Sequence, residues 1–175
     1  ANAIGGSGAL IKSGTNTLTL TGLHTYTGPT TINDGTLVIE NNAPTSSSSS
    51  FNGPGALAIQ PAASSFSSAF STSGWSLGNT LTGLALGKTG NTAALTVDRA
   101  TSIAGPISLY GGNIAINAAL TATGTNSVSM TGTVTDGPSG SIIADKLALL
   151  SGTVTLDNTS HSVNTLAASS GSLTY

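Results

Sequence analysis

The stretch Gly74–Gly78 matches G-x-S-x-G, a motif that in hydrolases places a nucleophilic serine on a sharp turn between a strand and a helix. Ser76 would also need a histidine base and a carboxylate that orients this base. The two histidines, His24 and His161, show no spacing from a carboxylate that indicates such a triad. No strand–helix pattern surrounds the motif, and a chain with 23 glycines and many serines produces it by chance. We therefore predict no catalytic residue and expect both histidines to be solvated.

Metal-binding chemistry has few candidate ligands in this sequence. The chain has no cysteine, and its two histidines are far apart, which leaves zinc almost without ligands. Residues Gly5–Gly8 begin like the glycine-rich calcium-binding nonapeptide, but Leu10 stands where that repeat has its aspartate. We predict neither a metal nor a cofactor.

Charged residues make up only 6% of the chain, and the formal net charge is −2. A basic surface for nucleic acid needs clustered cations, whereas the cations here stand far apart, at Lys12, Lys88, Arg99 and Lys146. Enzymes that degrade polysaccharides gather their charged residues in one cleft. The carboxylates here are scattered, at Asp34, Glu40, Asp98, Asp136, Asp145 and Asp157. A β-helical polysaccharide-degrading enzyme is therefore the alternative and not the main prediction.

The segment 41–78 differs in composition from the rest of the chain, and we predict a loop or insertion there. Its serine run, Ser46–Ser50, has nothing to bury, which is typical of a flexible loop. Phe66 and Phe70 are four residues apart, a spacing that would place both rings on one face of a short helix.

The same segment supplies the candidate ligand-binding residues. Trp75 is a candidate platform for a sugar ring, with Phe66 and Phe70 beside it, and Tyr26 is a further candidate outside the segment. The alternative for each of these rings is packing against the protein's own fold, with Tyr26 at a corner of the chain.

The elements that must position these residues are short strands. Apolar and small polar residues alternate with a period of two along the whole chain, and Gly, Asn and Asp lie between the alternating stretches. No stretch keeps a helical period for three turns. The expected strands lie around residues 18–20, 36–39, 56–59, 84–86, 95–97, 107–109, 114–116, 128–130 and 154–156.

Many short strands fit either an antiparallel sandwich or a parallel solenoid. Aromatic residues make up only 4% of the chain, which argues against a sandwich core. Low charge favours the solenoid, because like charges would repel one another in columns of strands about 4.8 Å apart. In such a solenoid the interior residues would be Leu18, Leu20, Ile32, Leu37 and Ile39, and the outward residues Thr17, Thr19, Thr31 and Thr36. Gly22, Gly28 and Gly35 are expected at corners whose backbone geometry a Cβ atom would oppose.

The N-terminal part contains an ordered series of short motifs: Lys12-Ser13-Gly14, Leu18-Thr19-Leu20, Thr25-Tyr26-Thr27-Gly28, Thr30-Thr31-Ile32 and Gly35-Thr36-Leu37. Together they closely resemble the repeat of autotransporter passenger domains. His24 and Asn16 depart from that pattern, which usually has Asn and Gly there. Residues 112–175 are similar to large secreted haemagglutinin-like exoproteins, through Gly112–Asn117, Gly152–Asn158 and Ser162–Ala167.

Both resemblances imply a right-handed parallel β-helix of about seven to eight coils, exported across a bacterial outer membrane to the cell surface. Residues 1–175 would be a single β-helix segment of a larger passenger, acting in adhesion or as a rigid stalk. Its expected partners are an outer-membrane translocator and a glycan or protein of a host or neighbouring cell, with no nucleic acid. End-to-end self-association through exposed strand edges is also expected. A scaffold without a ligand of its own is a further alternative.

Overall fold

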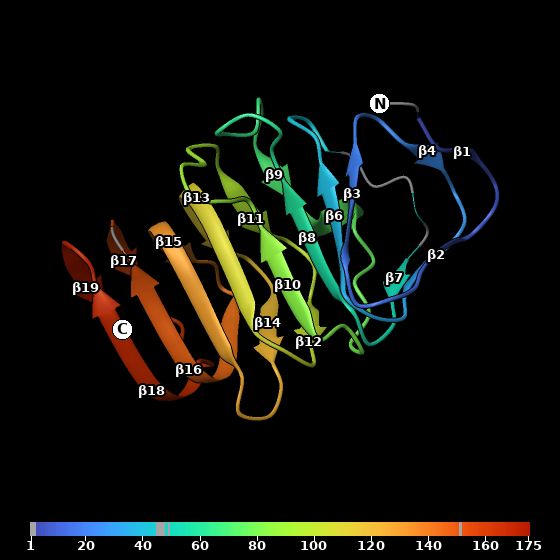
Figure 1. Ribbon diagram of the computed structural model, residues 1–175. Helices are drawn as coiled ribbons and strands as arrows, with labels where there is room; N and C mark the ends of the chain where they lie inside the picture. Colours follow the sequence, from blue (N-terminus) through green and yellow to red (C-terminus); the bar gives the residue numbers. More distant parts are fainter. Residues whose placement is uncertain (1–2, 45–47, 49, 151) are drawn as a thin grey trace.

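The computed structural model describes residues 3–44, 48, 50–150 and 152–175, and these residues form a parallel β-solenoid of about eight turns (Figure 1). All strand pairs among the described residues are parallel, which confirms the predicted solenoid and excludes the antiparallel sandwich. The strands are β1 (Gly5–Gly6), β2 (Leu10–Lys12), β3 (Thr17–Thr21), β4 (Thr25–Tyr26), β5 (Thr30–Ile32), β6 (Thr36–Glu40), β7 (Phe51–Asn52), β8 (Ala56–Gln60), β9 (Phe70–Ser71), β10 (Gly83–Leu86), β11 (Leu95–Val97), β12 (Thr101–Ile103), β13 (Ile107–Ile116), β14 (Ala119–Ala122), β15 (Ser127–Asp136), β16 (Ser141–Leu150), β17 (Thr153–Thr155), β18 (Ser162–Ser169) and β19 (Ser172–Thr174).

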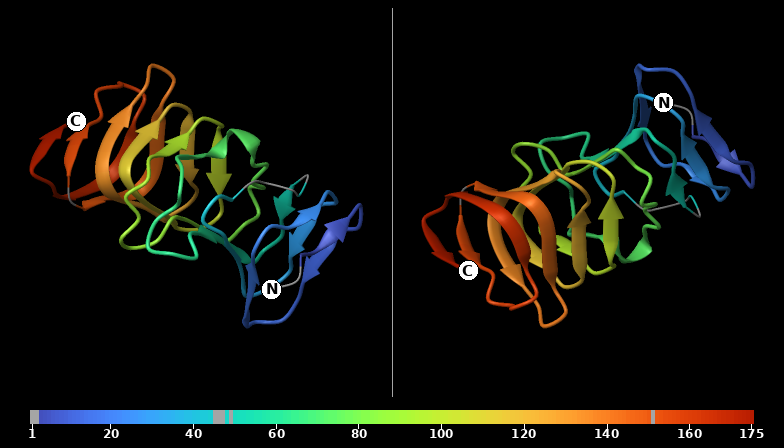
Figure 2. Two further views of the ribbon diagram at one scale, coloured as in Figure 1. Left: turned by 90° about the horizontal axis from the view of Figure 1, so that it is seen from above. Right: turned by 90° about the horizontal axis from the view of Figure 1, so that it is seen from below.

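The coils stack one after another from the N-terminal to the C-terminal end (Figure 2). A 14-stranded sheet runs through most of the stack, and smaller sheets, β2-β5-β7 and β1-β4, complete its N-terminal part. Strand β13 bends between two faces, because its first half pairs with β10 and its second half with β11. The register shifts at this bend, between Tyr110 and Asn113, where Gly111 and Gly112 lie.

The core consists of columns of apolar side chains that follow the strand register. Each inward position of one coil lies beside the same position of the next coil. One column is Leu18, Leu37, Leu57, Leu84, Ile107, Val128, Leu147 and Leu166, and a second is Leu20, Ile39, Ile59, Leu86, Leu109, Met130, Leu149 and Ala168. These columns bury aliphatic side chains along the whole stack.

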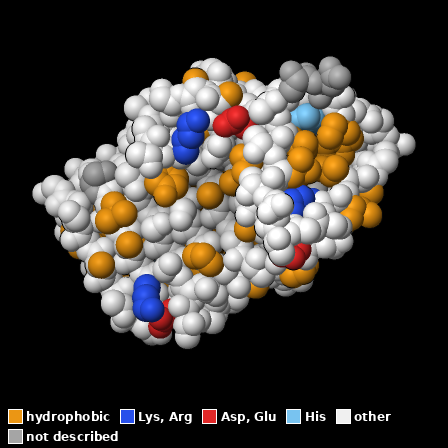
Figure 3. All heavy atoms as spheres, viewed as in Figure 1, with side chains coloured by type: hydrophobic (Ala, Val, Ile, Leu, Met, Phe, Trp, Pro, Cys, Tyr) orange, Lys and Arg blue, Asp and Glu red, His pale blue; other side chains and the backbone are white. Residues whose placement is uncertain are grey.

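Four of the five residues predicted to face the interior are buried, namely Leu20, Ile32, Leu37 and Ile39. Leu18 lies in the same column but is 36% exposed, because β3 is the last strand of the ladder at that end. The threonines predicted to face outward are exposed or half-buried. Charged side chains occupy only a few separated places on the face seen in Figure 3.

Two of the predicted corner glycines have no room for a side chain. A Cβ at Gly28 would lie 2.3 Å from the carbonyl oxygen of Gly8. A Cβ at Gly35 would lie 2.5 Å from the carbonyl oxygen of Asn16, and Gly35 also has φ +64°. These close approaches between adjacent coils confirm the prediction that a Cβ would oppose the corner geometry.

A buried lysine closes another corner. Lys12 is 5% exposed, and its Nζ donates hydrogen bonds to the carbonyl oxygens of Gly14, at 2.5 Å, and Asp34, at 2.9 Å. Asp34 belongs to the next coil, so the ammonium group links two coils. The Lys-x-Gly motif of the sequence is therefore a corner at which the lysine side chain donates hydrogen bonds to backbone carbonyl groups.

The segment 41–78 contains strands as well as loops. Strand β8 pairs with both β6 and β10 and so continues the main sheet through this segment. The predicted helix at Phe66 and Phe70 is wrong: Phe70 begins β9, and the helical turn nearby is the 3-10 helix Thr72–Gly74. Of the serine run, Ser46, Ser47 and Ser49 lie outside the described residues, whereas Ser48 is buried and donates a hydrogen bond to the carbonyl oxygen of Gly28. No helix of the described residues is long and apolar enough to cross a membrane.

The column of Leu18, Leu37 and Leu57 yields a test of the packing. Replacing Leu57, which is 1% exposed, with alanine should lower the free energy of unfolding by about 2–5 kcal/mol, because it opens a cavity between two coils. Leu18→Ala removes the same atoms from the uncovered end of the column and should cost less than half as much. Urea denaturation of both variants measures the difference. Equal losses would contradict the assignment of Leu18 to the end of the ladder.

Candidate functional site

The four aromatic residues predicted to contact a ligand are all buried, with exposed fractions of 3% for Tyr26, 5% for Phe66, 3% for Phe70 and 3% for Trp75. Phe66 stacks on Phe70 with ring centroids 5.5 Å apart, and Phe70 lies 5.7 Å from Trp75. Trp75 stacks in turn on Phe51 at 5.4 Å, a residue that was not among the predicted site residues. The ring faces therefore contact one another, and their contact with a ligand stays a prediction.

Tyr26 is the last residue of β4, and its side chain is buried. Its hydroxyl and the Oγ1 atom of Thr30 are 2.8 Å apart and hydrogen-bonded. Burial raises the pKa of the Tyr26 hydroxyl, and hydrogen bonds with Thr30 and Ser48 partly offset this effect. A buried hydroxyl in the neutral form serves as a structural hydrogen-bonding group.

A small cavity lies beside these rings, lined by Leu20, Gly22, Leu23, His24, Tyr26, Ile39, Asn41, Pro44, Phe51 and Trp75. Its volume is about 10 Å³, which is room for about one water molecule. A sugar ring does not fit into this space. The Nε2 atom of His24 is buried here and has no hydrogen-bond partner among the described residues.

The G-x-S-x-G motif does not form the turn that hydrolases use. Ser76 follows the 3-10 helix Thr72–Gly74, and Leu77 after it forms a single bridge with Phe51. The hydrolase turn needs a strand that leads directly into an α-helix, and neither the 3-10 helix nor the bridge at Leu77 provides this. The motif therefore has the local structure of a coil corner beside the aromatic rings.

Both histidines are buried, so the expectation that they are solvated is wrong. The Nε2 atom of His161 lies 2.8 Å from Oδ2 of Asp136, and its Nδ1 accepts a hydrogen bond from the backbone N–H of Ile142. Asp136 also accepts hydrogen bonds from the backbone N–H groups of Asp157 and Asn158. Because both ring nitrogens of His161 are engaged, neither is free to activate a nucleophile.

The most strongly hydrogen-bonded surface carboxylate is that of Asp98. It accepts hydrogen bonds from the hydroxyl of Ser71 at 2.5 Å, the hydroxyl of Thr96 at 2.6 Å and the amide of Asn117 at 2.7 Å. These bonds hold the pKa of Asp98 below its usual value, and the bond from Ser71 has the largest effect. The three donors come from β9, from β11 and from just beyond β13, so Asp98 joins adjacent coils. Among the described residues, no group of three or more His, Asp or Glu side chains gathers to hold a metal ion.

A comparison with protein-family models matches residues 10–39 to the passenger-associated-transport-repeat. Residues 10–39 form an autotransporter passenger repeat. In the structure the passenger repeat extends from β2 almost to the end of β6, and it includes Lys12, His24 and Tyr26. The repeat is a structural element of passengers and implies secretion to the cell surface. Searches of curated proteins and of solved structures gave no match. The match ends at residue 39, so the haemagglutinin-like similarity of residues 112–175 stays a prediction.

The carboxylate of Asp98 should contribute to stability in a pH-dependent way. Because its pKa is lower in the folded protein than the value of about 3.9 in an unfolded chain, its contribution is complete above about pH 4 and is lost as the pH falls through the folded value. Asp98→Asn should lower the free energy of unfolding at pH 7 by about 0.2–1 kcal/mol, a small effect because the group is exposed. Denaturation curves of both proteins from pH 7 to pH 3 test this. A difference that does not shrink in acid would contradict the proposed role.

Proposed function

We propose that this chain is a rigid spacing segment, a stalk, of a passenger displayed on the bacterial cell surface. The observation that carries the proposal is the continuous pair of apolar columns, which extends from Leu18 and Leu20 to Leu166 and Ala168 without interruption. Each coil is joined to the next by parallel strand pairing, and such a stack resists bending because every coil packs on its neighbours. At about 4.8 Å per coil, eight turns span on the order of 40 Å.

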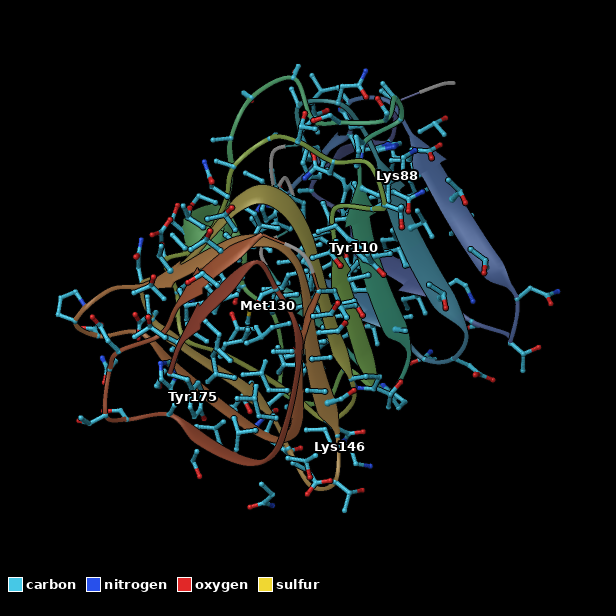
Figure 4. All side chains as sticks on the ribbon, turned by 90° about the vertical axis from the view of Figure 1, so that its left-hand side faces the viewer. Lys88, Tyr110, Met130, Lys146 and Tyr175 are labelled. Atoms are coloured by element: carbon cyan, nitrogen blue, oxygen red, sulfur yellow. The ribbon has the colours of Figure 1, made fainter. Side chains whose placement is uncertain are left out.

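The outer surface favours spacing over adhesion. The four rings predicted to contact a ligand are inside the stack, although Tyr175 is exposed. Figure 4 shows Met130 within the ring of the coils and Lys88 and Lys146 outside it. A shallow hollow on the outside of β8 and β10 is lined mostly by small side chains, including Ala58, Gly83 and Ala85. Adhesion usually relies on exposed aromatic and charged anchors, which this hollow lacks.

The surface also favours spacing over glycan degradation. Glycoside cleavage needs two carboxyl groups that face a common space. Here Asp136 is engaged by His161 and two backbone N–H groups, and Asp98 by three side chains. Both carboxylates have the structural role of joining coils.

A deletion of one coil tests the spacer proposal. Ile107 and Val128 occupy equivalent positions in adjacent coils, so removal of residues 107–127 joins Pro106 to Val128 with every inward position retained. This variant should fold and be shorter by one coil, about 4.8 Å, because a spacer depends on its repeating register and not on a particular coil. Circular dichroism measures its folding, and X-ray scattering measures its length.

The matched control removes residues 109–128, one residue fewer and within the strand, so that Ser129 takes the inward position of Leu109. This variant should be less stable than the first, because a shift of one residue in the middle of a strand turns inward side chains outward. The intact chain should also show no saturable binding on arrays of glycans and matrix proteins. Saturable binding that a surface substitution abolishes would overturn the spacer proposal in favour of adhesion.

A further inference from the structure

The two histidines of the chain make the same contact at opposite ends of the stack. The Nδ1 atom of His24 accepts a hydrogen bond of 3.1 Å from the backbone N–H of Ile4. The Nδ1 atom of His161 accepts a hydrogen bond of 3.0 Å from the backbone N–H of Ile142. In each case the isoleucine lies in the preceding coil. Each imidazole therefore satisfies a backbone donor of its neighbouring coil.

This contact requires a neutral imidazole. A ring nitrogen accepts a hydrogen bond only while it carries no proton, and both nitrogens carry one in the imidazolium form. Protonation of Nδ1 would place two N–H donors against each other and break the link between the coils. Histidine is also the side chain whose ordinary titration falls between about pH 5 and 8.

The two histidines differ in what surrounds Nε2. In His161 this atom lies beside the buried carboxylate of Asp136, which compensates a positive charge on the ring. In His24 it is buried without a partner among the described residues. The other titratable side chain that lines its cavity is Tyr26, whose hydroxyl bonds to Thr30. The nearby end of β6 carries Glu40, whose Oε1 accepts a hydrogen bond from Gln60.

Strand β1, which follows the residue that His24 contacts, is attached to the stack by few bonds. Strand β1 has two residues, both exposed, and pairs only with the two-residue strand β4. Its backbone bonds to that strand include Thr25 N–H to Ile4 O, at 2.8 Å, and Thr27 N–H to Gly6 O, at 2.9 Å. Loss of the His24 bond therefore removes a large share of what fixes β1, while β2 and β3 of the same coil stay paired with β5 and β6.

We propose that His24 is a pH-sensitive link between coils, and that its protonation in mildly acidic solution releases β1 from β4. The rest of the stack stays folded, because the pairing of its strands does not involve the His24 contact. This device is independent of the proposed spacing function, because a chain that serves only as a stalk could carry it or lack it.

Hydrogen exchange of backbone amides in the 175-residue chain tests the proposal. Between pH 7.5 and 5.5, and after correction for intrinsic exchange, protection of the Ile4, Thr25 and Thr27 amides should fall by up to about tenfold per pH unit, the limit for one proton. Protection of Leu109, inside β13, should not change. Unchanged protection at Ile4 would overturn the proposal.

The matched variant is His24→Asn. Asparagine places an amide oxygen close to the position of Nδ1 and does not titrate, so Ile4 should stay protected in acid. Acid loss of protection in this variant equal to that of the unmodified chain would overturn the proposal. Within the unmodified chain, the Ile142 amide should lose less protection than Ile4, because Asp136 compensates His161.

A nitrogen NMR spectrum of the unmodified chain at pH 7.5 supplies a measurement that needs no variant. It should show the proton of the His24 ring on Nε2 and an unprotonated Nδ1, as the hydrogen bond from the Ile4 N–H requires. A proton on Nδ1 at this pH would overturn the proposal.

Discussion

The structure depends on one constraint, which is residue-for-residue register between strands of successive coils. Parallel pairing places equivalent positions about 4.8 Å apart, so a side chain that fits in one coil is repeated by a similar one above and below. The columns that begin at Leu18 and Leu20 follow from this register. The step from Leu57 to Leu84 is longer than its neighbours, and its extra residues form the segment that carries Phe66, Phe70 and Trp75. The rings fill the interior where the coil is widened, which explains why the largest side chains occur there and aliphatic ones elsewhere.

Much of this architecture could be predicted from the sequence, because a fixed register requires recognisable residue patterns in each strand and corner. Alternation of period two identifies strands, and Gly28 and Gly35 mark corners where backbone approaches backbone. The exposure of Leu18 could not be predicted, since it depends on where the ladder ends. The spacing of Phe66 and Phe70 suggested a helix, but tertiary pairing of Phe70 with Leu95 overrides that local preference.

The candidate site was less predictable for a different physical reason. Apart from Thr96, which is two residues from Asp98, the partners of Asp98, His24 and His161 lie about one coil away in the sequence, 19–27 residues, and no local pattern connects them. Aromatic type also does not tell whether a ring packs inside or faces solvent. The histidines were expected to be solvated because the sequence shows no pairing of a carboxylate with either of them, yet Asp136 reaches His161 from the preceding coil. In a solenoid, the neighbours that determine the chemistry of a residue are set by coil length.

Side-chain links at the corners complete the hydrogen bonding that the ladders leave open. Lys12 donates hydrogen bonds to backbone carbonyl groups, and His24 and His161 accept them from backbone N–H groups. Asn91 does both: it donates to the carbonyl oxygen of Tyr110 and accepts from the N–H of Phe66. Such links act between adjacent coils, so each one adjusts the stability of the junctions that it touches and leaves the columns elsewhere unchanged. Strands of ten residues hold the junctions around β13, β15 and β16, whereas two-residue strands hold β1 on β4. A change of charge beside a long strand pair therefore has little effect on the pairing, while the same change beside the short pair decides whether β1 stays paired with β4.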